Sequence, residues 1–199
     1  MKQHLLSALT VGLLGFLLLP ATVSATQTTV ELNANQETIE GRLHLKYLAL
    51  QNTVSVGYNG IYKEDEYRLA GAELLLGDEI LPDLSCSIGF RGVYGEVTSI
   101  PKDPNISSVG FSGKAKYTLF RDELRFPLIL ATQLTVSPKP LSFEDTENYW
   151  SFRSNLDINV LQNSGITVGY RYRDADLEKR GIERSYSEDS VFIGFKLTF

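Results

Sequence analysis

Apolar and polar side chains alternate along nearly the whole chain after residue 25. Between residues 166 and 173, Ile, Val, Tyr and Tyr occupy every second position, and Thr, Gly, Arg and Arg occupy the others. A strand places successive side chains on opposite faces, so a period of two specifies strands with one apolar face. Because no segment after residue 25 has the period of a long helix, we expect an all-β fold.

The alternation divides this part of the chain into ten segments. The predicted strands are residues 27–35, 37–49, 53–63, 66–76, 84–98, 106–120, 125–137, 147–161, 165–174 and 189–199. Each is long enough for the roughly nine to eleven residues that a tilted strand needs to cross a bilayer. In the segment 66–76 the apolar residues change face near residues 70–72, which predicts a bulge there.

The connections predict which end of such a sheet faces which side. Short connections at 51–52, around 82–83, at 121–124 and at 162–164 alternate with longer ones at 99–105, 138–146 and 175–188, which are rich in charge or proline. Short turns at one end and longer loops at the other are typical of outer-membrane barrels. In such a barrel an even number of strands would hold both termini at the periplasmic end.

The alternation alone does not say which face points inward, because a soluble barrel has the same pattern with its apolar residues inside. Three features favour the inverted arrangement. The polar face carries many ionisable groups of both signs, and the chain ends in Phe199 on an apolar face. Aromatic residues that suit a bilayer interface lie near strand ends, as at Tyr47, Tyr94, Tyr149, Trp150 and Tyr172. We predict a closed antiparallel up-and-down transmembrane β-barrel of about ten strands.

The first 25 residues have the features of an export signal. Lys2 precedes a mostly apolar run at residues 5–19, and Val23-Ser24-Ala25 supplies small residues for cleavage near Ala25. The run is too short for a spanning helix. We expect residues 1–25 to be a cleaved signal peptide and residues 26–199 to form a single barrel domain in the bacterial outer membrane.

The composition excludes some classes of partner. With 24 acidic and 19 basic side chains, the formal net charge is -5, which argues against a nucleic-acid partner. The single cysteine, Cys86, excludes an intramolecular disulfide and a cysteine-based zinc site. No motif for a cofactor or a metal is present, so none is expected.

The end of the chain has a recognisable pattern. Phe199 is the last residue, Leu197 and Phe195 precede it at alternate positions, and Gly194 comes before them. This pattern resembles the terminal strand that outer-membrane proteins present to the barrel-assembly machinery, with Phe192 in place of the usual polar residue.

Other short passages resemble one family. They are Tyr94-Gly95, residues 138–143 and Val168-Gly169-Tyr170-Arg171, which together with the last strand resemble the YfaZ-type family of small bacterial outer-membrane proteins. The resemblance implies an outer-membrane barrel and provides no catalytic residues. Outer-membrane lipid, lipopolysaccharide and the barrel-assembly machinery are the partners we expect.

Ionisable residues on the polar faces are the candidate lumen residues. They are Arg153, Arg171, Arg173, Arg91, Asp157, Glu40, Arg42 and His44. They would either form a salt-bridged plug or line a narrow anion-preferring pore. A ten-stranded barrel has a constricted lumen, and burying like charges without partners is costly. We therefore favour a largely closed, charge-paired interior in a structural or narrow porin-like protein.

Two other classes of function stay open. One is a secreted or periplasmic soluble barrel that binds an apolar ligand inside. The other is an outer-membrane lipid-modifying enzyme or protease, for which His44, the only histidine after residue 25, is the candidate base. No nucleophile or acid lies at a spacing that supports catalysis, so we expect no enzyme.

Overall fold

The structure, a computed structural model, describes residues 26–49, 52–98, 104–119, 126–179 and 181–199. The predicted signal peptide and its cleavage position near Ala25 lie outside the described residues. So do residue 51 and residues 99–103 and 121–124, which belong to three of the predicted connections.

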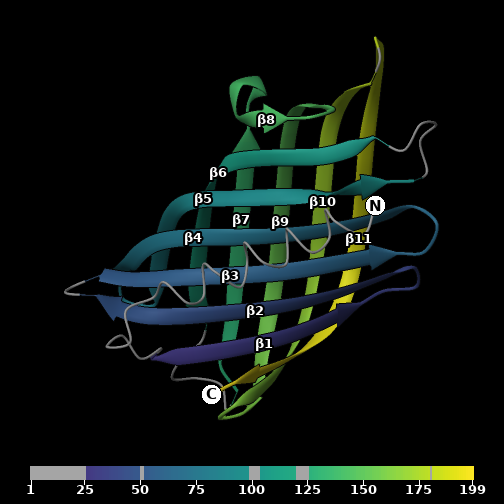
Figure 1. Ribbon diagram of the computed structural model, residues 1–199. Coiled ribbons are helices and arrows are strands. Elements are labelled where there is room, and N and C mark those ends of the chain that lie inside the picture. Colours follow the sequence, from purple (N-terminus) through teal and green to yellow (C-terminus); the bar gives the residue numbers. More distant parts are fainter. Residues whose placement is uncertain (1–25, 50–51, 99–103, 120–125, 180) are drawn as a thin grey trace.

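Ten long antiparallel strands within the described residues form one closed sheet (Figure 1). They are β1 (Gln27–Ala34), β2 (Thr38–Ala49), β3 (Asn52–Lys63), β4 (Tyr67–Leu81), β5 (Leu84–Val97), β6 (Asn105–Leu119), β7 (Leu128–Ser137), β9 (Thr146–Leu161), β10 (Ser164–Lys179) and β11 (Ile182–Thr198). Neighbours in the chain pair with each other, and β1 pairs with β11 to close the ring. The predicted fold class is confirmed.

Short elements occupy the connection between β7 and β9. They are the 3-10 helix η1 (Lys139–Leu141) and the two-residue strand β8 (Ser142–Phe143), which pairs with β6. Among the described residues, no helix is long and apolar enough to cross a membrane.

The two ends of the barrel differ in what they hold. Gln27 and Thr198 lie at one end with the turns at 82–83 and 162–163, and we call it the terminal end. The opposite end holds the turns at 35–37 and 64–66 and the longer connection at 138–145, and we call it the loop end. Because the longer connections of outer-membrane barrels face outward, we expect the terminal end to be the periplasmic one.

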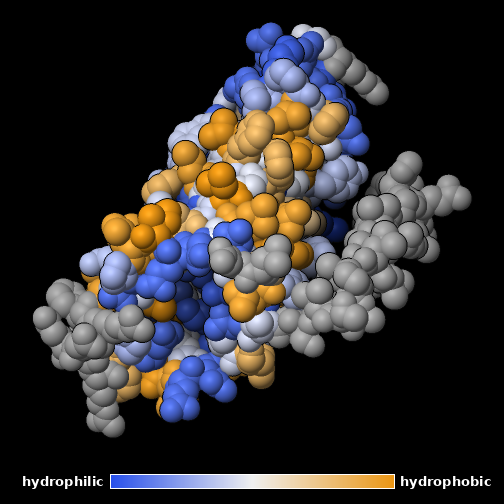
Figure 2. Space-filling view, turned by 90° about the vertical axis from the view of Figure 1, so that its left-hand side faces the viewer, coloured by the Kyte–Doolittle hydropathy of each residue, from blue (hydrophilic) through white to orange (hydrophobic). Residues whose placement is uncertain are grey.

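The outer wall is apolar. On β11, Val191, Ile193 and Phe195 are 66%, 61% and 50% exposed, whereas Phe192 between them is 3% exposed. Figure 2 shows hydrophobic side chains across the middle of this face, and hydrophilic ones at its upper end and in its lower half. This is the reverse of a soluble barrel, so that alternative is wrong. A closed barrel satisfies its backbone hydrogen bonds internally and can hold such a wall in lipid.

The aromatic residues near strand ends divide between the two faces. Trp150 and Tyr172 stack on the outer wall with ring centroids 4.7 Å apart, and Tyr94 is also exposed. Tyr149, in contrast, is 3% exposed and lies inside the barrel, so its predicted place at the bilayer interface is wrong. The reason is its position next to Trp150, which puts it on the opposite face of the strand.

The charged segment 175–188, predicted as a loop, is mostly strand. β10 and β11 stay paired from Ala175 opposite Tyr186 to Lys179 opposite Ile182. The high charge density suggested a solvated loop. However, Ala175, Leu177 and Tyr186 are buried inside the barrel, and most of the charged residues between them face away from this cluster.

The bulge predicted near residues 70–72 is also wrong. β4 pairs with β3 and β5 without a shift there, and its irregularity lies between Glu79 and Leu81. The apolar residues of β4 change face because the interior itself changes character along the strand. Near the loop end Leu69 points inward, and further along Leu74 points outward to the wall.

Candidate functional site

The structure places all eight candidate lumen residues on the inward face of the barrel. Six are buried and two, His44 and Arg91, are half-buried. They do not form one cluster but divide among several groups, each of which contains a carboxylate. These groups contain residues that the sequence analysis did not single out.

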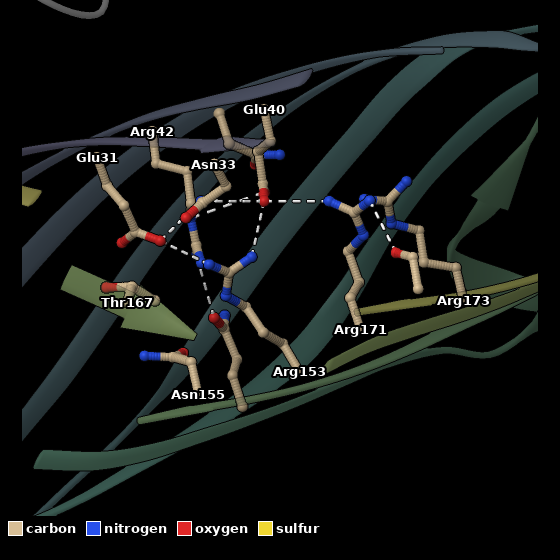
Figure 3. A network of polar contacts seen from close by, with 12 residues as sticks. Glu31, Asn33, Glu40, Arg42, Arg153, Asn155, Thr167, Arg171 and Arg173 are labelled. Carbon is tan, nitrogen blue, oxygen red and sulfur yellow. Dashed lines mark hydrogen bonds and ion pairs between the residues drawn. The ribbon is translucent and has the colours of Figure 1, made fainter. Parts of the chain in front are cut away.

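Glu40 is the centre of the first group (Figure 3). One of its oxygens accepts hydrogen bonds from Arg153, at 2.7 Å, and from Arg171, at 3.1 Å. Arg153 also donates to Glu31 at 2.6 Å. Asn33 donates to Glu31 at 2.7 Å and is 1% exposed. This group connects β1, β2, β9 and β10 through the lumen.

Glu188 holds the second group, nearer the loop end. Its oxygens lie 3.4 Å from Arg173 and 3.9 Å from Arg171, and Tyr67 donates to it at 2.7 Å. Glu188 is not among the predicted lumen residues, because the charge of its segment favoured a loop over a strand. Ser190 of β11 points into the lumen and accepts a hydrogen bond from Arg171. Glu188 lies two residues earlier, so extending the alternation of β11 by one step would have placed it on the same inward face.

Glu73 and Gln133 form a third group that sequence reasoning missed. Glu73 accepts from Arg91 at 3.2 Å and from Gln133 at 2.7 Å, and it lies 3.5 Å from Nδ1 of His44. Gln133 in turn accepts from Arg42 at 3.4 Å. β2 and β7, which carry Arg42 and Gln133, lie five places apart in the ring of ten strands. This hydrogen bond therefore spans the full width of the lumen.

Asp157 belongs to a separate group at the terminal side. It accepts from Lys196 and Asn155, each at 2.7 Å, and from Thr167 at 2.8 Å. Among the described residues, it forms no hydrogen bond or ion pair with Arg153, Arg171 or Arg173. Within the part of the chain that the structure describes, Asp157 is thus separate from the groups around Glu40, Glu188 and Glu73, which we together call the plug.

Phe192, the departure from the usual assembly pattern, has a place inside the lumen. The guanidinium carbon of Arg153 lies 4.1 Å from the centre of its ring, and that of Arg171 lies 6.0 Å away. A cation over an aromatic face is stabilised by the ring quadrupole. The ring of Phe192 thus stabilises the two arginines that bind Glu40.

Gly194 also serves this group. A Cβ at this position would come within 2.0 Å of Oδ1 of Asn33 and 2.8 Å of the backbone oxygen of Leu32. Only glycine at position 194 therefore leaves enough space for the side chain of Asn33. The other residues of the predicted assembly signal, Phe195, Leu197 and Phe199, are exposed on the outer wall and at the end of the chain.

An apolar cluster fills the lumen at the loop end. Its members are Ile61, Tyr67, Leu69, Val93, Val97, Ile106, Tyr149, Ala175, Leu177 and Tyr186. Tyr67 and Ile106 are 1% exposed, and Val97 and Ala175 are fully buried. Side chains thus pack the barrel at this level as they pack a soluble core.

The terminal half of the lumen is hollow. A cavity of about 440 Å³ extends there, from Gln27 and Gln162 at the terminal end to Arg42, Gln133 and Arg153. Six of the residues that line it are cationic and four are acidic: Arg42, Lys46, Lys114, Lys116, Arg153 and Lys196, and Glu31, Asp78, Glu79 and Asp157. Among the described residues, no group of three or more His, Cys, Asp or Glu side chains is arranged to hold a metal ion.

One ion pair outside the barrel wall ties down the longer connection at the loop end. Lys139 of η1 donates a hydrogen bond to Glu147 at the start of β9. This bond raises the pKa of Lys139.

Comparison with known proteins adds the family. A family model described as YfaZ precursor matches residues 7–199. The chain belongs to the YfaZ family. The resemblance found in the sequence is thereby confirmed, and the precursor form together with the apolar wall of the closed barrel identifies this YfaZ-family chain as an exported outer-membrane protein.

A search of curated proteins gives no match. Among solved structures, one from a study of in-meso crystallization of membrane proteins has 10% identity and a TM-score of 0.46, covering 88% of this chain and 83% of the other. The NanC porin has 16% identity and a TM-score of 0.41, covering 86% and 98%. The Acinetobacter baumannii outer membrane protein Omp33 has 9% identity and a TM-score of 0.35, covering 89% and 98%. These scores are low, so the fold of the YfaZ-family chain rests on its own strand pairing.

Proposed function

We propose that this protein is a structural outer-membrane barrel whose lumen is closed to general diffusion. The hydrogen bond between Arg42 and Gln133, which joins opposite strands, carries the proposal. The Glu40 and Glu188 groups and the apolar cluster fill the lumen between this bond and the loop end. A hydrated ion would have to break these contacts to pass.

Conductance in planar lipid bilayers tests the closed lumen. The purified barrel is expected to give no steady current under conditions in which a general porin conducts. The double variant Arg42→Ala with Tyr67→Ala is expected to conduct. It removes the bond from Arg42 to Gln133 and the ring of Tyr67, which lies in the apolar cluster and bonds Glu188. Heat-modifiable migration on a detergent gel serves as the folding control for this variant.

Steady current through the unaltered barrel would overturn the proposal and favour a narrow porin-like channel. In that case the variant with Arg171→Glu and Arg173→Glu would decide whether the arginines set the ion preference. A current that favours anions in the original barrel and cations in the variant would assign that role to them.

The protein is proposed not to be an enzyme. His44, the only candidate base, faces the carboxylate of Glu73 at 3.5 Å inside the lumen, which supports a role in the polar network. A loss of lipid- or peptide-hydrolysing activity in His44→Ala, with unchanged folding, would contradict this part of the proposal.

The partners we propose are outer-membrane lipid, lipopolysaccharide and, through β11, the barrel-assembly machinery. Phe195 and Leu197 on the outer face of the closing strand support recognition before the barrel closes against β1. Deletion of Phe199 is expected to reduce the fraction of heat-modifiable barrel in membranes. Unchanged assembly without Phe199 would argue against this role of the terminal residue.

A further inference from the structure

Three lysines in the terminal-end cavity have no carboxylate partner in the part of the chain that the structure describes. Within the described residues, no carboxylate oxygen lies within 4.0 Å of the ammonium groups of Lys46, Lys114 and Lys116. The arginines deeper in the lumen, in contrast, form the ion pairs described above. Among the described residues, the fold therefore pairs the arginines of the lumen and Lys196 with carboxylates, and leaves only Lys46, Lys114 and Lys116 of the cavity without one.

The acidic residues around the cavity do not correct this imbalance. Glu31 is bound by Arg153 and Asp157 by Lys196, so each already has a cation. Asp78 and Glu79 are exposed at the terminal end of β4. The interior of the cavity thus carries an excess of positive charge.

The unpaired lysines surround the cavity from two walls. Lys114 and Lys116 point inward from β6, and Lys46 points inward from β2, which lies four places away in the ring of ten strands. Lys114 and Lys116 are two residues apart on one face, about 7 Å along the strand. Like charges at this separation in a confined space repel each other, and a bound anion would relieve the repulsion.

Each unpaired lysine has a serine as its neighbour on the adjoining strand. Lys46 lies opposite Ser55, Lys114 opposite Ser87 and Lys116 opposite Ser85, and all three serines line the cavity. A hydroxyl is small and adds a hydrogen-bond donor beside the ammonium group. Three ammonium–hydroxyl pairs around one cavity match a ligand with several anionic oxygens.

We propose that the terminal-end cavity binds a small anion with two or more negative charges, taken up from the periplasmic side. Its volume of about 440 Å³ is within the range of small-molecule pockets. The anionic groups are carboxylates or phosphates, since both accept hydrogen bonds from ammonium and hydroxyl donors. The plug lies between the cavity and the loop end and keeps the ligand at the terminal end.

Titration calorimetry of the purified barrel with citrate and with pyrophosphate tests the proposal. One molecule per barrel is expected to bind, more weakly as salt is added, and acetate is expected to bind about tenfold less tightly or worse. Tighter binding of citrate would identify a carboxylate site, and tighter binding of pyrophosphate a phosphate site. Failure of both probes to bind at millimolar concentration would overturn the proposal.

Variants locate the site. Lys114→Gln with Lys116→Gln is expected to weaken binding by about tenfold or more, because two of the charged donors are lost. The matched control is Lys63→Gln at the loop end, where Lys63 pairs with Glu37 and Glu66 outside the cavity, and its binding is expected to be unchanged. Equal affinity in the double variant and the original barrel would also overturn the proposal.

A measurement on the unaltered barrel avoids any effect of the variants on folding. Citrate is expected to slow acetylation of Lys114 and Lys116 by a water-soluble amine reagent, as measured by peptide mass spectrometry. Acetylation of Lys139, which is exposed at the loop end, is expected to proceed at the same rate with and without citrate. Equal rates at the cavity lysines would contradict the site, and bilayer conductance does not enter this result.

Discussion

The two halves of the lumen are filled in opposite ways. Toward the loop end, apolar side chains such as Val97 and Ala175 are fully buried, and the arginines beneath them are matched with carboxylates. Toward the terminal end, a cavity remains, and Lys46, Lys114 and Lys116 face it without a carboxylate partner among the residues that the structure describes. The closed half behaves as a protein core, whereas the hollow half has the charge of a binding site.

The difference arises along single strands. On β6, the inward residues change from Ile106 in the apolar cluster to Lys114 and Lys116 at the cavity, and on β2 from Glu40 in the paired network to Lys46 at the cavity. The wall stays apolar throughout, so the same alternation supports both kinds of interior. Substitutions in the closed half should therefore affect stability, and those in the hollow half should affect binding.

The largest effect on stability is expected from Glu40→Gln. The substitution leaves Arg153 and Arg171 buried with less compensating charge, which is expected to cost about 3 kcal/mol. Urea unfolding of the barrel in lipid vesicles measures the change. The control is Glu37→Gln, whose side chain is 68% exposed, and an equal unfolding midpoint for both variants would show that the Glu40 group does not hold the closed half together.

A smaller loss is expected from Gly194→Ala. The new methyl group would meet Asn33 at 2.0 Å and a backbone oxygen at 2.8 Å, and overpacking of this kind costs about 1–3 kcal/mol. The same unfolding assay applies. Gly60→Ala is the matched control, because no atom lies within 4 Å of its added Cβ. If Gly194→Ala and Gly60→Ala have the same urea midpoint of unfolding, Gly194 does not matter for packing inside the lumen.

Phe192→Leu is expected to cost about 1 kcal/mol, because it removes the ring beneath Arg153 while keeping an apolar side chain. Its effect should be smaller in Glu40→Gln, where the same group is already disturbed, so the double variant measures the coupling. Phe143→Leu, at an exposed position of β8, is the control. If the changes in the free energy of unfolding of Phe192→Leu and Glu40→Gln add up exactly in the double variant, the ring does not stabilise the Glu40 group.

The smallest effect is expected from Lys139→Gln. The ion pair with Glu147 lies outside the lumen, and solvent screens a pair whose lysine is 69% exposed. We expect no measurable change in the unfolding midpoint. A decrease as large as that of Gly194→Ala would mean that the loop-end connection contributes to closing the lumen.

The strands were predictable because each one must keep its apolar side chains on one face. The alternation was sufficient for β9 and β10, where Arg153 and Arg171 could be assigned to the inward face from the sequence. The alternation did not identify Glu73 as an inward residue, because apolar residues of β4 lie inside the barrel near the loop end and on the outer wall further along. It fails for Glu188, because the charges around it suggested a loop.

Pairing between the inward residues was not predictable. Glu40 and Arg153 are 113 positions apart in the chain, and they meet only because the ring closes with a particular register. A neutral residue such as Gln133 gave no signal of its own. Its part in bridging the lumen depends on β7 lying opposite β2.

The sequence by itself determined that this protein consists of strands with an apolar and a polar face, since alternation fixes the direction of each side chain relative to its own strand. Only the tertiary structure decided which charges meet across the lumen and which lysines face the cavity without a carboxylate. The physical reason is that alternation contains no information on strand register or ring closure, and those two properties set every distance between residues on different walls.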